Sequence, residues 1–133
     1  MRATASGRFE VEVKPQGKPE VHEGTTLGRL SLSKNFSGDL VGHGRGTMLT
    51  AMTGVQGSAG YVAIERVNGS LAGRAGGFAL QHSGTMARGN QSLTICVVPD
   101  SGTGGLAGLS GTLEIRIDNG QHFYEFHYEL PGD

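Results

Sequence analysis

The chain has 133 residues, of which 11 are lysine or arginine and 12 are aspartate or glutamate, giving a formal net charge of −1. This length is typical of a single domain, taken here as residues 1–133. The lack of a basic run argues against a nucleic-acid partner, and no apolar run approaches the ~20 residues needed to cross a bilayer. Because Cys96 is the single cysteine, an internal disulfide is excluded, and we expect a protein of the reducing cytoplasm.

Glycine accounts for 24 of the 133 residues, well above its usual share of about 7%. A glycine in a helix interior costs roughly 1 kcal/mol relative to alanine, so this abundance argues against a helical protein. The glycines separate regular apolar segments, which favours a folded β-protein over a disordered chain.

Eight segments have the pattern of extended strands. In the first, Phe9, Val11 and Val13 point to one face while Glu10 and Glu12 point to the other, as in a strand with one solvated face. The last two segments alternate most clearly, and the third is extended but interrupted by glycines. In chain order the expected strands are 8–14, 29–36, 40–52, 60–67, 76–86, 92–99, 111–118 and 122–130.

The turns between these segments predict how the strands are connected. Asp118, Asn119 and Gly120 lie between two alternating segments and give the strongest hairpin signal. No segment has sustained helical periodicity, so the crossover helices that parallel strands need are missing. The sequence therefore predicts an antiparallel meander. Eight such strands can close into a barrel, which removes exposed sheet edges, and a two-sheet sandwich is the alternative.

One glycine-rich loop matches a dinucleotide-binding pattern, through Gly102, Gly104 and Ala107. A phosphate-binding loop of that kind follows a strand and opens a helix, because the helix N-terminus holds the pyrophosphate. Here the strand 111–118 follows instead of a helix, so we interpret the loop as a corner between two strands.

Several motifs resemble a known family. The run 102–111 resembles a corner that recurs in allene oxide cyclase-like barrels and, more distantly, in dirigent proteins. Together with 36–42, 64–73, 77–84 and 98–104, in the family's order, it resembles a bacterial family of unknown function with that fold. The resemblance implies an all-β protein with few or no helices. Its expected fold is an eight-stranded antiparallel β-barrel, allene oxide cyclase-like and calycin-like, with a partly apolar interior and no assigned reaction.

Two candidate catalytic residues follow from strand parity. His82 shares its face with Phe78 and Leu80 and is expected to point into the barrel. Glu65 and Ile64 lie on opposite faces of their strand, and Glu65 points inward if its face is the buried one. Burial would raise the pKa of the Glu65 carboxyl, so that the two residues could act as general acid and base. The alternatives are a core or rim histidine and an ion pair between Glu65 and a neighbouring arginine.

Further side chains are candidates for substrate binding. Tyrosine hydroxyls could polarise a carbonyl or epoxide oxygen, and a flexible thioether suits an irregular apolar ligand. Ordinary barrel packing is the alternative for all of them. The candidate substrate-binding residues are Tyr61, Phe78, Tyr124, Tyr128 and Met48.

No metal or cofactor is expected. His122 and His127 are five residues apart and fall on opposite faces of a strand, so they cannot chelate one ion from a regular strand. Cys96 has no charged neighbour in its strand and is interpreted as packing.

The expected function is therefore the handling of a small hydrophobic molecule in the barrel interior. Three kinds of protein are considered: a cofactor-independent isomerase or cyclase, a non-catalytic binder of lipophilic ligands, and an oligomeric structural protein. Outward apolar residues predict a homo-oligomer, with a dimer favoured: Val62, Ile64, Val98 and Phe123.

Overall fold

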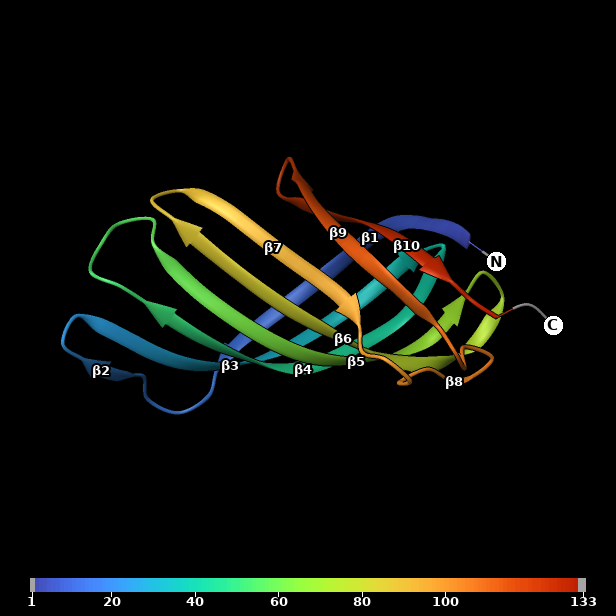
Figure 1. Ribbon diagram of the computed structural model, residues 1–133, viewed down its shortest axis with the longest axis horizontal. Helices are drawn as coiled ribbons and strands as arrows, with labels where there is room; N and C mark the ends of the chain where they lie inside the picture. Colours follow the sequence, from blue (N-terminus) through green and yellow to red (C-terminus); the bar gives the residue numbers. More distant parts are fainter. Residues whose placement is uncertain (1, 132–133) are drawn as a thin grey trace.

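The computed structural model describes residues 2–131 and contains ten β-strands and, within these residues, no helix (Figure 1). Eight strands form the wall: β1 (Arg2–Pro15), β3 (Thr25–Gly38), β4 (Leu40–Met52), β5 (Ala59–Leu71), β6 (Arg74–Ala87), β7 (Asn90–Val97), β9 (Ser110–Asp118) and β10 (Gln121–Glu129). Two short strands, β2 (Glu20–His22) and β8 (Thr103–Gly104), pair with β3 and β6.

The wall strands pair in chain order, each antiparallel to the next, as the meander prediction requires. The N-terminal part of β1 pairs with β10, and its C-terminal part pairs with β3, so β1 closes the sheet into a barrel. The barrel prediction is confirmed, and the sandwich alternative is wrong. All eight expected strands are present, whereas β2 and β8 were not predicted because two or three residues are too few to show alternation.

The barrel is closed at one end by a packed apolar core. Phe78 stacks on Phe126 with 5.8 Å between ring centroids, and both side chains are fully buried. The loop between β8 and β9 folds over this end and inserts Leu106 and Leu109, which are 0% and 2% exposed. The closed end therefore depends on a loop as well as on the strands.

Glycines allow this loop to approach the wall closely. A Cβ atom on Gly102 would lie 2.0 Å from the Leu106 carbonyl oxygen, and one on Gly76 would lie 2.0 Å from the Thr103 oxygen. Either contact would be a severe clash, so these positions require glycine. The glycine-rich corner joins two antiparallel strands, as the sequence predicted, and the structure shows that it also closes this end of the barrel.

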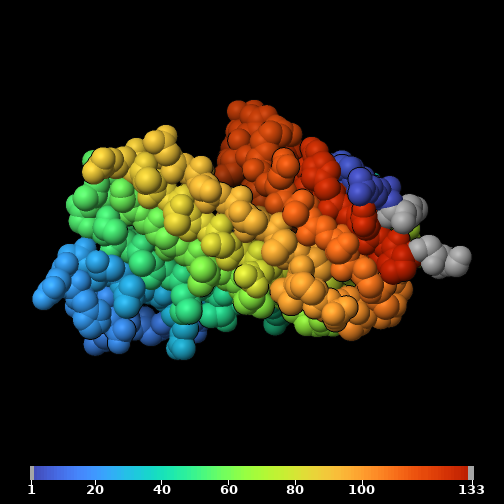
Figure 2. All heavy atoms as spheres, in the orientation of Figure 1, coloured from blue at the N-terminus to red at the C-terminus, as the bar shows by residue number. Residues whose placement is uncertain are grey.

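The opposite end of the barrel is open. β7 and β9 pair at one position only, Cys96 with Thr112, whereas the other neighbouring wall strands pair over longer stretches. β7 and the β9–β10 hairpin diverge toward this end in Figure 1, and Figure 2 shows a notch in the surface between them. The hairpin turns through Asn119 and Gly120, whose φ angles of 51° and 75° suit the tight turn that Asp118, Asn119 and Gly120 predict.

A buried tyrosine joins the closed end to the turn between β3 and β4. The Tyr124 hydroxyl accepts a hydrogen bond from the Leu40 backbone N–H at 2.9 Å and donates to the Ser37 carbonyl oxygen at 2.8 Å. The ring also meets Phe36 edge-on, with 5.7 Å between centroids. Tyr124 therefore links β10 to two strands on the other side of β1.

We expect Tyr124→Phe to lower the free energy of unfolding by about 1–3 kcal/mol, because a buried N–H and a carbonyl lose their partner. Tyr61→Phe is the matched control, since the Tyr61 hydroxyl makes none of the hydrogen bonds described for residues 2–131 and should change stability by at most about 0.5 kcal/mol. Urea denaturation of both variants measures the difference. Equal stabilities would contradict the structural role of Tyr124.

Candidate functional site

The open end leads into a cavity of about 740 Å³ inside the barrel. Its wall is mainly apolar and comes from the ends of strands on all sides. The mouth carries exposed apolar side chains, among them Met52 at 59% and Ile117 at 65% exposure. Residues deeper in the cavity include Phe9, Val11, Leu32, Met48 and Ile115. The cavity is thus an apolar space with access to solvent.

Three polar side chains meet at the inner end of this cavity. Lys34 and His82 line it and are only 5% and 3% exposed, and Glu65 lies behind them with no exposure. One carboxylate oxygen, Glu65 Oε1, is 2.8 Å from Lys34 Nζ and 2.6 Å from His82 Nε2. We call Lys34, Glu65 and His82 the polar cluster.

The strand register explains how these residues meet across the sheet. Lys34 is on β3 and Glu65 is on β5, with β4 between them, and the positions of β4 paired with them are Gly44 and Gly46. A Cβ atom on Gly44 would lie 2.4 Å from Glu65 Oε2. Because these inward positions of β4 have no side chain, the lysine and the carboxylate can reach each other over the strand.

The pKa of Glu65 is lowered, which contradicts the sequence-based expectation of a raised value. Burial is the largest single effect and raises the pKa, but the hydrogen bond from His82 and the charge and hydrogen bond of Lys34 together outweigh it. Glu65 is therefore an ionised acceptor, and His82 Nε2 carries the hydrogen that it donates to the carboxylate. The alternative for Glu65, an ion pair with a neighbouring arginine, is wrong in the identity of the cation, which is Lys34.

The cluster leaves hydrogen-bonding capacity unused. Among the buried side-chain atoms of residues 2–131, Glu65 Oε2 has no hydrogen-bond partner. Lys34 makes one described hydrogen bond and otherwise faces aromatic rings, with Nζ 5.0 Å from the Phe9 centroid and 5.9 Å from that of Phe36. These aromatic faces stabilise the ammonium without satisfying its remaining N–H groups.

The candidate residues from the sequence separate into two groups. Glu65 and His82 are in contact, as their parity allowed, while Tyr61 and Met48 line the cavity beyond them. Burial raises the pKa of Tyr61, so its hydroxyl stays protonated. The remaining candidates are buried toward the closed end and do not line the cavity: Phe78, Tyr124 and Tyr128.

Sequence reasoning missed Lys34, although a signal was present. Lys34 has the same strand parity as Leu32 and Phe36, both of which are buried. A lysine between two inward apolar residues is an exception to alternation, and such an exception marks a buried charge that needs a partner.

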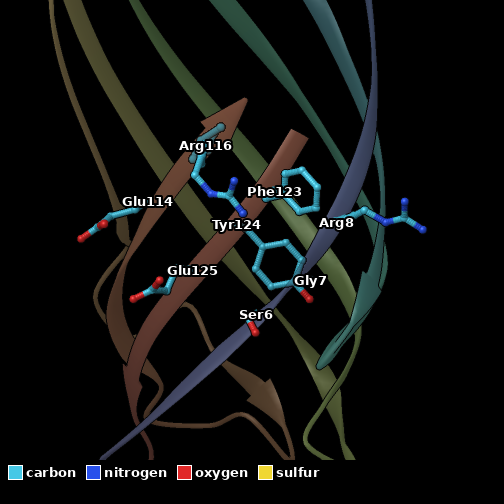
Figure 3. A pocket seen from close by; sticks show the side chains of 9 residues that line it. Ser6, Gly7, Arg8, Glu114, Arg116, Phe123, Tyr124 and Glu125 are labelled. Carbon is cyan, nitrogen blue, oxygen red and sulfur yellow. The ribbon is translucent and has the colours of Figure 1, made fainter. Parts of the chain in front are cut away.

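A second hollow, of about 450 Å³, lies along β1, β9 and β10 (Figure 3). Its charged groups already have partners: the Arg116 guanidinium covers the Phe123 ring at 4.6 Å, and Glu125 is 3.0 Å from His127 Nε2. Arg8 donates to Gln121 at 3.1 Å. The polar cluster in the barrel interior is therefore the better candidate site.

No group of three metal-binding side chains comes together within residues 2–131. Over the same range, no helix is long and apolar enough to cross a bilayer.

Comparison with known proteins identifies the family. A family model described as a protein of unknown function, DUF3224, matches residues 5–128. The chain belongs to this DUF3224 family. A crystal structure of a DUF3224 protein of unknown function from Shewanella oneidensis MR-1 is similar at 48% identity, with a TM-score of 0.94 and 100% coverage of both chains. No curated protein matches. The barrel is thus shared with a solved member of the DUF3224 family.

Removing the carboxylate of the polar cluster should destabilise this DUF3224 barrel strongly. We expect Glu65→Gln to cost about 3–5 kcal/mol of unfolding free energy, since it leaves the Lys34 ammonium buried without a counter-charge. The double variant Lys34→Met, Glu65→Gln removes both charges and should recover part of the loss. Glu12→Gln is the control, because Glu12 pairs with Lys14 at 2.9 Å on the surface and should cost at most about 1 kcal/mol.

The effect of Glu65→Gln should depend on pH. Since the folded-state pKa of Glu65 lies below its ordinary value of 4.5, the unfolded chain binds the proton more readily, and ionised Glu65 stabilises the fold above that value. This contribution is lost as the pH falls through the lowered pKa. The difference between wild type and Glu65→Gln in urea denaturation should shrink from about pH 7 to about pH 3. A difference that stays constant would contradict the ionised carboxylate.

Proposed function

We propose that the protein binds a small hydrophobic molecule inside the barrel. The observation that supports this best is the apolar cavity of about 740 Å³ with the polar cluster at its inner end. This volume falls within the range of about 300–1,000 Å³ that is typical of ligand sites, which combine apolar walls with a few well-placed polar groups. A structural protein with a filled interior fits this geometry less well.

The direction of ligand entry follows from the asymmetry of the barrel. The loop that inserts Leu106 blocks one end, while exposed apolar side chains such as Met52 surround the other. An apolar molecule would enter through the open end and bury its surface against Met48 and Ile115. Lys34 and His82 would then meet its innermost atoms.

Catalysis is a second candidate function, favoured by the position of His82 at the cavity surface. The lowered pKa of Glu65 leaves His82 as the proton carrier, with Glu65 orienting the imidazole and Lys34 polarising an oxygen of the substrate. This arrangement suits a cofactor-independent isomerase or cyclase that moves a proton next to a carbonyl group.

Association into a dimer and a cytoplasmic location remain predictions. Leu49, Val62 and Ile64 are about half exposed on the outer faces of β4 and β5, where a second copy could pack. Val98 follows β7 and Phe123 lies on β10, and neither of these strands neighbours β4 or β5, so the two half-buried residues do not extend this patch.

Filling the cavity should abolish binding of a neutral hydrophobic dye. We expect Met48→Trp to weaken the binding of Nile red at least roughly tenfold, because the indole occupies the space of the ligand. Leu49→Trp is the matched control, since the neighbouring side chain points outward and is 52% exposed. Dye fluorescence measures binding, and far-UV circular dichroism checks the fold. Unchanged binding by Met48→Trp would contradict a ligand in the interior.

The catalytic candidate has a separate test. In deuterated buffer, the protein should accelerate deuterium exchange next to the carbonyl of a long-chain methyl ketone, as followed by mass spectrometry. His82→Ala should slow this exchange by about 10²–10⁴-fold, whereas His43→Ala, which removes an exposed imidazole, should not. Exchange no faster than in buffer would exclude this reaction and leave binding alone.

A further inference from the structure

We propose that the molecule bound in the cavity is a lipophilic monocarboxylate, with its head group at Lys34 and its apolar body directed toward the mouth. This inference rests on the proposed function, because it names the class of ligand for the same cavity. Three observations carry it, namely the sign of the lining charges, the unused donors of the polar cluster and the depth at which the cluster lies.

The ionisable side chains that line the cavity favour an anion. Apart from Tyr61, whose raised pKa keeps it neutral, those on the inward face are all basic: Lys34, His82 and His122. Arg29 borders the mouth, but it pairs with Leu49 on the outer face of the sheet. Among residues 2–131, no aspartate or glutamate lines the cavity, since Glu65 lies behind its surface. Lys34 is therefore the fixed positive charge at the inner end, and an anionic head group there meets no like charge among the side chains that line the cavity.

The polar cluster has donors available for an oxygen ligand. An ammonium group has three N–H donors, and the hydrogen bonds described for Lys34 use one of them, to Glu65. A buried donor without a partner is unfavourable, and a carboxylate oxygen forms the stronger, charge-assisted type of hydrogen bond with an ammonium. The Nε2 hydrogen of His82 is already donated to Glu65, so the donors for the head group are those of Lys34.

Depth decides the orientation of the ligand. Lys34 is 5% exposed at the inner end, whereas Arg29 is exposed to solvent on the outer face of β3 near the mouth. An interaction with a buried cation is screened less than one with an exposed cation, so the anionic head gains more at Lys34. The opposite orientation would place an apolar chain end against the unsatisfied N–H groups of Lys34.

Competition between two ligands of equal chain length tests this inference. Dodecanoate and dodecanol differ in the head group, so displacement of Nile red by each gives the preference for the anion. We expect wild-type protein to bind dodecanoate at least roughly tenfold more tightly than dodecanol. The variant Lys34→Met, Glu65→Gln, which removes both charges and so avoids an unpaired buried ion, should lose this preference, because its affinity for dodecanoate falls more than its affinity for dodecanol.

Arg29→Met is the matched control, because it removes an exposed cation near the mouth and should leave the preference for dodecanoate within about threefold. Equal binding of the two ligands by wild type would overturn the inference while the proposed binding function stands. A preference lost in Arg29→Met but kept in the double variant would place the head at the mouth and also overturn it. If Nile red itself does not bind, the proposed function fails as well.

Discussion

A carboxylate with no exposure to solvent, Glu65, imposes the constraint around which the barrel interior is arranged. An ionised group in an apolar interior is stable only when it is paired and hydrogen-bonded. Glu65 meets this condition through one oxygen, which accepts from both Lys34 and His82. The pairing in turn requires Gly44 on the intervening strand, since a side chain there would collide with the carboxylate.

The same cluster marks the boundary between two environments. On one side, Phe78 and Phe126 pack beneath the loop that carries Leu106, and solvent is excluded. On the other side, β7 and β9 pair at a single position and the cavity begins. A closed meander has no free edges along most of its wall, so access to the interior is confined to the end where the strands diverge.

Much of the fold could be predicted from the sequence because strands with one buried face alternate with a period of two. Alternation placed Tyr124, Phe126 and His82 inward, and the turn at Asn119 and Gly120 predicted a hairpin.

Parity gives the direction of a side chain but neither its height in the barrel nor the path of a loop. For that reason the sequence grouped Phe78, Tyr124 and Tyr128 with the site, although they lie toward the closed end. The pKa of Glu65 was misjudged because its partner Lys34, thirty-one residues away, was not recognised as an inward residue.

The cost of the polar cluster favours a role beyond stability. Replacing a buried ion pair by apolar side chains of similar volume is often neutral or stabilising, so a barrel of this kind does not need Lys34 and Glu65 in order to fold. Their N–H and oxygen atoms remain incompletely satisfied beside an apolar cavity, which is unfavourable in the empty protein. A ligand that supplies an oxygen to Lys34 would remove part of this cost only when bound. The hydrogen bonds that Lys34 does not make in the empty barrel then form when the ligand binds. They favour molecules that carry such an oxygen over molecules that do not.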